Sequence, residues 1–257
     1  MKKYLLFTLF FLFTSLTPAQ TVEELISQGD QLATKEFKNT EALEKFLAAD
    51  KLSPNNWEVY WRLSRTYVDI GEHLPAGSDA QKAEQLSKYQ QAFNYADKAV
   101  KLAPDKSVTY LRRAIVNGRI ALFKGVWDAL GLVKDVKADL EKAIKLGNGG
   151  NEIQATAHYV LGRTHTKVCE KSYFVRLPLG LGWGDIKVAI AEIKKAIELR
   201  PNFRMFHYDL AIAYIEDDDY KSARLALQKI PSIPVADEDD VKLAGDAKKL
   251  LEEIKNK

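Results

Sequence analysis

Apolar residues recur along the chain at intervals of three and four, which is the spacing of one face of an α-helix. Four segments show this spacing most clearly, at 57–71, 108–122, 157–168 and 206–220. A second set of helical segments shares a common ending. This ending reads FLAADKLSP, YADKAVKLAP, LEKAIKLGN and IKKAIELRP at its four occurrences. A helix hairpin of this kind cannot bury its apolar face alone. The pattern therefore predicts an all-α protein built from stacked helical hairpins.

The common ending places a small residue and a large apolar residue at fixed positions before a final Pro or Asn. The alanines stand five residues before it, at Ala49, Ala99, Ala143 and Ala196, and the leucines two before it, at Leu52, Leu102, Leu146 and Leu199. We expect both sets to form a contact stripe on the second helices. In the first helices, Ala114, Gly162 and Ala211 are small enough to let a neighbouring helix approach closely.

These positions resemble the tetratricopeptide repeat (TPR). The matching residues are Tyr60, Leu63, Ser64, Tyr67, Gly71, Ala92, Ala96, Ala99 and Pro104 in the best repeat, Leu210, Ala211, Tyr214, Ala223 and Leu227 in the last, and Ala42, Phe46, Ala49 and Pro54 in the first. The repeat endings at Pro54, Pro104, Asn148 and Pro201 are further apart than the roughly 34 residues of a TPR unit. Each hairpin must therefore carry inserted residues, which we place at 72–88, 123–135 and 172–185.

Long insertions together with a last helix within 234–257 are similar to the regulator of microtubule dynamics family and its bacterial relatives, over most of residues 57–257. This resemblance implies a TPR-like α-solenoid of about five helical hairpins, with long intra-repeat insertions and a C-terminal capping helix. Eukaryotic members of the family are associated with microtubules and organelle membranes. A chain that carries an export signal would not meet microtubules, so the resemblance implies architecture more than role.

The first nineteen residues have the three regions of a secretory signal peptide. Two lysines precede an apolar run over 4–13, and small residues end at Ala19. We expect cleavage after Ala19, export to the periplasm or medium of a bacterium, and a single repeat domain over 20–257. An uncleaved membrane anchor is the alternative, although the apolar stretch is short against the roughly 20 residues that span a bilayer.

Net charge and cysteine content limit the kinds of partner and cross-link that we expect. The chain has 38 basic and 35 acidic residues, and loss of Lys2 and Lys3 with the signal leaves 36 against 35. A near-neutral chain argues against a nucleic-acid surface. Cys169 is the only cysteine, so no intrachain disulfide can form. We expect a monomer that contacts a membrane only if the signal segment is retained.

The segment SYFVRLPLGLGWGD (172–185) interrupts the helical pattern with an apolar, glycine-rich stretch. Its G-x-G-x-G spacing differs from the G-x-G-x-x-G of a dinucleotide loop, and no strand precedes it. Asp185 is instead expected to cap a helix that begins at Ile186. Its aromatic residues Tyr173, Phe174 and Trp183 either cover the core or form a contact surface for a partner or membrane.

Candidate metal and catalytic groups are sparse. His158, His165 and Cys169 share one face of a helix over 151–171, but no fourth ligand for zinc is identifiable, so interior packing is favoured. The acidic runs 217–219 and 237–240 lack the EF-hand pattern and fit helix turns or caps. No nucleophile can be paired with a base. We therefore expect no metal, no cofactor and no enzymatic activity.

Aromatic and arginine residues mark a candidate binding groove. Alignment with the TPR pattern places five residues on the concave face, namely Trp61, Arg65, Tyr159, Arg163 and Tyr208. Such side chains dominate many binding interfaces. The carboxylate clamp known in some TPR proteins needs Lys and Asn where this chain has Trp61 and Arg65, so that clamp is not expected. The alternative is a purely structural role, in which Trp61 and Tyr159 only pack between repeats.

Sequence reasoning thus favours an exported, non-catalytic scaffold that binds a protein or peptide through its concave face. Two alternatives remain. One is a periplasmic small-ligand-binding TPR protein of the kind associated with solute transporters, with inserted helices around a closed apolar pocket. The other is a membrane- or cytoskeleton-associated protein similar to the regulators of microtubule dynamics, if the N-terminal segment is an uncleaved anchor.

Overall fold

The computed structural model of the protein describes residues 20–257, and the predicted signal peptide at 1–19 lies outside the described residues. Over residues 20–257 the chain forms twelve α-helices and one short 3-10 helix, with no strand. None of the helices in this part of the chain is both long and apolar enough to cross a membrane. The predicted all-α, TPR-like fold is confirmed.

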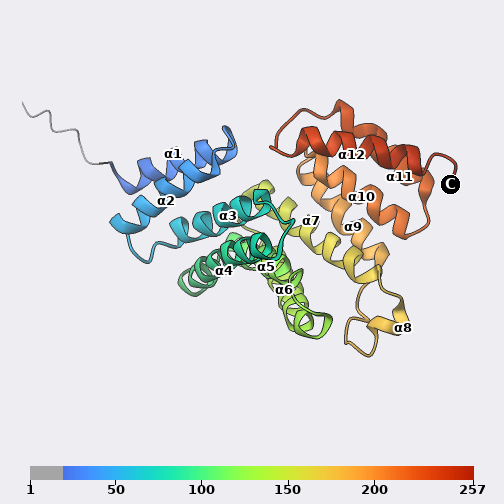
Figure 1. Cartoon of the computed structure of the whole chain (residues 1–257), viewed down its shortest axis with the longest axis horizontal. Coiled ribbons are helices and arrows are strands. Elements are labelled where there is room, and N and C mark those ends of the chain that lie inside the picture. Colours follow the sequence, from blue (N-terminus) through green and yellow to red (C-terminus); the bar gives the residue numbers. More distant parts are fainter. Residues whose placement is uncertain (1–19) are drawn as a thin grey trace, which may run out of the picture.

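The helices pair into five successive antiparallel hairpins that curve around a concave inner face (Figure 1). The pairs are α1 (Val22–Thr34) with α2 (Asn39–Leu52), α3 (Trp57–His73) with α4 (Asp79–Leu102), α5 (Ser107–Ala121) with α6 (Val126–Leu146), α7 (Gly150–Cys169) with α9 (Ile186–Leu199), and α10 (Arg204–Glu216) with α11 (Tyr220–Lys229). The 3-10 helix Ile230–Ser232 follows, and α12 (Asp240–Glu253) packs against α10 and α11. Five hairpins and a capping helix are therefore present, as predicted.

Small residues of the second helices carry the packing between helices. The four alanines of the common ending are all fully buried. The prediction was wrong for Leu52 and Leu102, which are exposed, whereas Leu146 and Leu199 are half-buried and Leu199 packs against the core cluster that includes Ala196. A residue three positions after an alanine is rotated about 60° from it around the helix axis. This rotation carries Leu52 and Leu102 out of the contact stripe that the alanines occupy.

Gly162 sets the closest approach between two helices of one hairpin. A Cβ atom at this position would lie 2.6 Å from Cγ1 of Ile193 and 2.8 Å from the carbonyl oxygen of Ala189, both on α9. Ala114 and Ala211, at the equivalent positions of α5 and α10, are fully buried. The predicted close approach of neighbouring helices at these three residues is confirmed.

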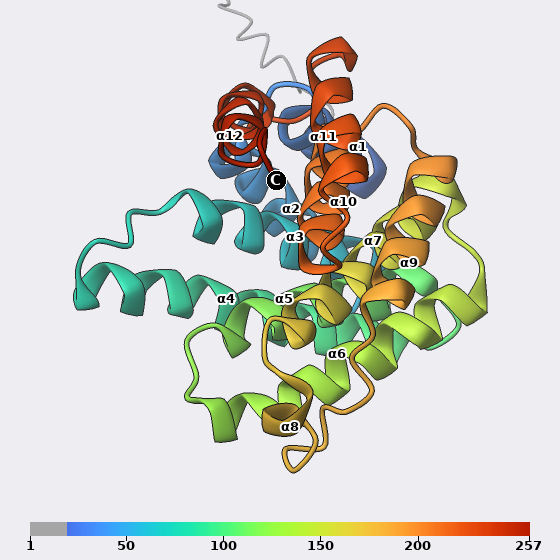
Figure 2. The ribbon, with the colours of Figure 1, turned by 90° about the vertical axis from the view of Figure 1, so that its right-hand side faces the viewer.

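Two of the predicted insertions lengthen helices instead of forming separate loops. Segment 72–88 completes α3 and supplies the first turns of α4, whose start is fixed by a capping box between Ser78 and Gln81. The segment 123–135 likewise enters α6 from Val126 onward. In Figure 2 the hairpin of α3 and α4 projects from the stack for this reason.

The link between α7 and α9 contains one helical turn, α8 (Tyr173–Arg176), and then returns to helix at Ile186. The carboxylate of Asp185 accepts hydrogen bonds of 2.8 Å from the backbone NH of Lys187 and 3.2 Å from that of Val188. Asp185 is thus the N-cap that the sequence predicts. The carboxylate of Asp219 caps α11 in the same way through the backbone NH of Ser222 at 3.0 Å.

The segment between the 3-10 helix and α12 is held by two buried side chains. The guanidinium group of Arg204 donates to the carbonyl oxygens of Ile233 and Asp240, at 2.8 Å and 3.1 Å. The carboxylate of Asp240 accepts from the backbone NH of Ala236 at 2.7 Å and of Asp237 at 3.0 Å. The acidic run 237–240 therefore forms a turn before α12.

Candidate functional site

Charged side chains of the first helices form a cluster on the inner face. We define this inner-face cluster by ten residues: Asp30 on α1, Arg62, Arg65, Asp69 and Glu72 on α3, Arg112 and Arg119 on α5, Tyr159 and Arg163 on α7, and Asp209 on α10. Helices α3, α5, α7 and α10 each contact the next in this order. Together with Asp30 on α1, which pairs with Arg62 on α3, the cluster therefore draws residues from all five hairpins.

At one end of the cluster, Arg62 donates hydrogen bonds through Nε and Nη1. Its Nε donates to both carboxylate oxygens of Asp30, at 3.0 Å and 2.8 Å, and its Nη1 donates to the carbonyl oxygen of Glu58 at 2.9 Å. The same guanidinium group lies over the indole ring of Trp61, 4.2 Å from its centroid. These contacts fix the position of Trp61 on the inner face.

In the middle of the cluster, two half-buried carboxyl groups lie among arginines. Burial raises the pKa of Glu72, and its ion pair with Arg119 opposes that shift. Burial also raises the pKa of Asp69, against the opposing effects of Arg65 and Arg112. Desolvation disfavours the charged form of both carboxyl groups, and the neighbouring arginines favour it.

At the other end, Tyr159 and Arg163 on α7 share one carboxylate on α10. The hydroxyl of Tyr159 donates to Oδ2 of Asp209 at 2.6 Å and accepts from Nη1 of Arg163 at 3.2 Å. Nε of Arg163 lies 3.5 Å from the same carboxylate oxygen. Burial, and then the charge of Asp209, raise the pKa of Tyr159. The phenol therefore stays a hydrogen-bond donor over the whole physiological pH range.

The structure brings four of the five predicted groove residues into two pairs. Trp61 lies beside Arg65, with the guanidinium carbon 5.7 Å from the ring centroid, and Tyr159 lies beside Arg163. Glu72 and Arg119, between the pairs, interact electrostatically with Arg163 and Tyr159 respectively. Tyr208 is placed differently, because it packs in the apolar cluster that includes residues of α12.

The three aromatic residues of the 172–185 segment divide into two groups. Phe174 is 87% exposed and Tyr173 is also exposed. Trp183 is half-buried, and its ring meets the edge of His165 with centroids 5.0 Å apart. Tyr173 and Phe174 thus match the contact-surface alternative, whereas Trp183 covers the core.

The histidine and cysteine stripe of α7 engages other partners. Nδ1 of His158 lies 2.6 Å from the carboxylate of Glu192, and Nδ1 of His165 accepts from the backbone NH of Asp185 at 3.2 Å. The thiol of Cys169 lies 3.5 Å from Nη1 of Arg176, and burial raises its pKa. No group of three or more metal-ligating side chains occurs within residues 20–257.

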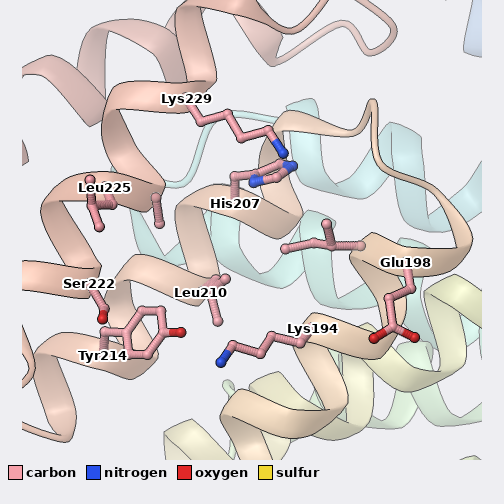
Figure 3. Close-up of a pocket in the computed structure, with 10 residues that line it drawn as sticks. Lys194, Glu198, His207, Leu210, Tyr214, Ser222, Leu225 and Lys229 are labelled. Atoms are coloured by element: carbon pink, nitrogen blue, oxygen red, sulfur yellow. The ribbon is translucent and has the colours of Figure 1, made fainter.

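Two pockets of about 430 and 470 Å³ lie away from the inner-face cluster. The first, shown in Figure 3, is bounded by α9, α10 and α11, with Leu210 and Tyr214 at its floor. Lys194, Glu198 and Leu225, which also line it, are exposed, so this pocket opens to the surface. It differs from the closed apolar pocket that the small-ligand alternative requires.

Comparison with known proteins identifies the family. Residues 25–255 match the family described as Regulator of microtubule dynamics protein 1-3. The chain belongs to this family. It is 22% identical over 240 residues to Regulator of microtubule dynamics protein 2 of Mus musculus. The aligned region covers 91% of this chain and 56% of the mouse protein. It is 25% identical over 247 residues to Regulator of microtubule dynamics protein 1 of Bos taurus, covering 92% of this chain and 73% of that protein.

Solved structures show that this member of the regulator of microtubule dynamics family has a TPR fold. A thermophilic TPR protein of Thermus thermophilus superposes with a TM-score of 0.65 at 17% identity, covering 89% of this chain and 100% of the other. PilW, described as a widely conserved type IV pilus biogenesis factor, superposes with a TM-score of 0.53 at 16% identity, covering 91% of this chain and 90% of PilW. At these identities the likeness concerns the fold alone.

Sequence reasoning singled out only Arg65, Tyr159 and Arg163 among the ten residues of the inner-face cluster in this family member. The other seven gain significance only when the helices stack, namely Asp30, Arg62, Asp69, Glu72, Arg112, Arg119 and Asp209. One signal was present: Arg112 stands two residues before the small residue Ala114, just as Arg62 stands two residues before Ser64. The shared register of these repeats would have placed both arginines on the same face.

Proposed function

We propose that this protein is a non-catalytic scaffold that binds a segment of a protein or peptide through its inner face. One observation carries the proposal: aromatic and arginine side chains from successive first helices, led by Trp61, Arg65 and Arg163, share one concave surface. Aromatic rings supply contact area at low entropic cost, and guanidinium groups supply forked donors. The TPR fold supports this reading, because solenoids present extended concave binding surfaces.

We propose further that the protein is exported and acts outside the cytoplasm of a bacterium. The support is the sequence of residues 1–19, with its lysines, apolar run and small residues before Ala19. Intact-mass measurement of the chain recovered from a secreting host tests this. We expect a mature protein that begins at Gln20; a recovered chain that still begins at Met1 in the cytoplasmic fraction would contradict export.

Selection from a random peptide library displayed on phage tests the binding function. Purified full-length chain is immobilised, and the affinity of enriched peptides is then measured by fluorescence anisotropy. We expect Trp61→Ala to weaken the bound peptides at least tenfold, because it removes the aromatic anchor of the inner face.

The chain offers a matched control for this substitution. Trp127 is 76% exposed near the start of α6 and does not belong to the inner-face cluster. Trp127→Ala therefore removes an equal side chain from a different surface, and we expect it to leave the affinity unchanged. Equal losses in both variants, or no effect of Trp61→Ala in a folded protein, would reject the inner face as the binding surface.

A further inference from the structure

Three guanidinium groups gather around one indole ring at the junction of α3 and α5. The guanidinium carbons of Arg62, Arg65 and Arg112 lie 4.2, 5.7 and 5.5 Å from the centroid of Trp61. Arg112 comes from α5, and the other two come from α3. The stacking of two hairpins thus concentrates positive charge in a place that no single helix could provide.

The three arginines differ in how well their donors are satisfied. Arg62 donates through Nε to the carboxylate of Asp30 and through Nη1 to the carbonyl oxygen of Glu58. Arg65 is 14% exposed, and its nearest carboxylate oxygens are 3.6 Å away at Asp30 and 3.9 Å away at Asp69, beyond hydrogen-bond distance. Its buried Nε and Nη2 atoms make no hydrogen bond with any described residue. Arg65 therefore holds donors that its own neighbours leave open.

Arg112 has even fewer partners. Its Nε is buried and makes no hydrogen bond among the residues that the structure describes. Burial, followed by the charges of Arg65 and Arg62, lowers the pKa of Arg112 to about 10, with Asp69 and Glu152 opposing the shift. Leaving a buried charged donor unsatisfied is costly, in general by more than a neutral hydrogen bond is worth. An anion placed between Arg65 and Arg112 would relieve both the repulsion and the open donors.

We propose that Arg65 and Arg112 form an oxyanion-binding subsite of the inner face, with Trp61 as its wall. The subsite would take a carboxylate or a phosphorylated side chain of the bound peptide. This inference rests on the proposed function and adds the chemistry of the ligand. Guanidinium groups suit such ligands because their planar forks match two oxygens of a carboxylate or phosphate at once. The indole face would contact the apolar part of the residue that carries the anion.

Binding of short defined peptides tests the subsite. The probes are fluorescently labelled hexaglutamate, hexaglutamine, and a hexaglutamine in which one residue is phosphoserine, together with inorganic phosphate as a competitor. We expect at least one anionic peptide to bind at least tenfold more tightly than hexaglutamine, and added salt to weaken it. Tighter binding of hexaglutamate would identify a carboxylate, and tighter binding of the phosphoserine peptide with competition by phosphate would identify a phosphate. Equal affinity for all three peptides would overturn the inference.

Charge-removal variants locate the site. Arg65→Gln and Arg112→Gln should each reduce the affinity for the anionic peptide at least tenfold. Lys101→Gln removes an equal charge from the exposed end of α4 and should leave the affinity within twofold. Loss in all three variants would indicate a general charge effect and contradict the subsite.

Thermal stability distinguishes a binding role from a structural one. If Arg112 is an unsatisfied cation kept for a ligand, Arg112→Met should raise the melting temperature of the free protein while it abolishes binding of the anionic peptide. A lower melting temperature with unchanged peptide binding would show a structural role and overturn the inference. If library-selected peptides depend on Trp61 but not on Arg65 or Arg112, the oxyanion subsite fails and the proposed function stands.

Discussion

The side-chain amide of Asn39 donates a hydrogen bond of 3.1 Å to Oε1 of Glu238, although the two residues are 199 positions apart in the chain. Asn39 begins α2, and Glu238 belongs to the turn before α12. Nε2 of His73, at the end of α3, lies 3.7 Å from carboxylate oxygens of both Glu238 and Asp239. These contacts join the turn before α12 to the first two hairpins, so they link the two ends of the repeat array.

The contact between His73 and the turn before α12 should depend on pH. Burial alone would lower the pKa of His73, but the hydrogen bond to the carbonyl oxygen of Asp69 and the charges of Glu238, Asp239 and Glu72 outweigh it and raise the pKa above 6.5. A raised pKa means that the contact is stabilised fully below about pH 6.5 and loses this stabilisation as the pH rises through the folded-state value. We expect segment 233–240 to be more protected from hydrogen exchange at pH 6 than at pH 8, after correction for intrinsic rates.

Replacement of the histidine provides the control for this prediction. His73→Gln keeps a polar side chain but cannot acquire a charge. We expect the protection of segment 233–240 in this variant to be the same at both pH values and close to that of the wild type at pH 8. A pH dependence that persists unchanged in His73→Gln would assign it to other groups.

Gly162→Ala should destabilise the protein. The added methyl group would meet Ile193 and the backbone of Ala189 at less than 3.0 Å, so α7 and α9 would have to separate. We expect a loss of about 1–3 kcal/mol in the free energy of unfolding, measured by urea denaturation. Gly118→Ala is the matched control, because it lies in α5 with nothing within 4 Å of the new Cβ. This second change should stabilise by roughly 0.5–1 kcal/mol through helix propensity; the same sign for both would refute the packing argument.

Asp139→Asn should destabilise the protein, although it hardly changes the size of the side chain. Asp139 is 9% exposed on α6, and its two oxygens accept from Nη2 and Nε of Arg113 on α5, each at 2.8 Å. Arg113 would keep one carboxylate partner in place of two, namely Asp97 at 3.2 Å. Because the substitution removes a charged acceptor from two hydrogen bonds, we expect a loss of about 1.5–3 kcal/mol in the free energy of unfolding, again measured by urea denaturation.

The exposed pair of Lys195 and Glu198 is the comparison for Asp139. These side chains are also 2.8 Å apart, but both face solvent. Glu198→Gln should therefore leave the urea midpoint unchanged, because solvent screens the pair. Similar losses for the two substitutions would show that burial does not govern the strength of these ion pairs.

Phe174→Ser should not weaken the fold, because the ring is almost entirely in solvent. Trp183→Ser should reduce the melting temperature by several degrees, since it removes the ring that packs against His165 and leaves a cavity. Thermal unfolding followed by circular dichroism measures both. A large loss for Phe174→Ser would mean that Phe174 covers the core and would remove it from the contact-surface hypothesis.

Local features of this protein were predictable because they depend on residues close together in the chain. The alternation of first and second helices follows from apolar spacing, and the N-cap at Asp185 follows from an acid before a periodic segment. The buried alanines were predictable as well, since a small residue repeated at one position of a hairpin marks helix contact. The leucines beside them were not, because a rotation of about 60° around a helix separates a buried residue from an exposed one.

The sequence alone determined an all-α repeat protein of five hairpins and a cap, since periodicity and punctuation act over one or two helices. Only the tertiary structure decided which charges meet on the inner face. Arg65 and Arg112 lie on different hairpins, and their distance depends on the curvature and rotation that accumulate as hairpins stack. The same holds for the contact between Asn39 and Glu238, which requires the whole array to bend until its ends meet.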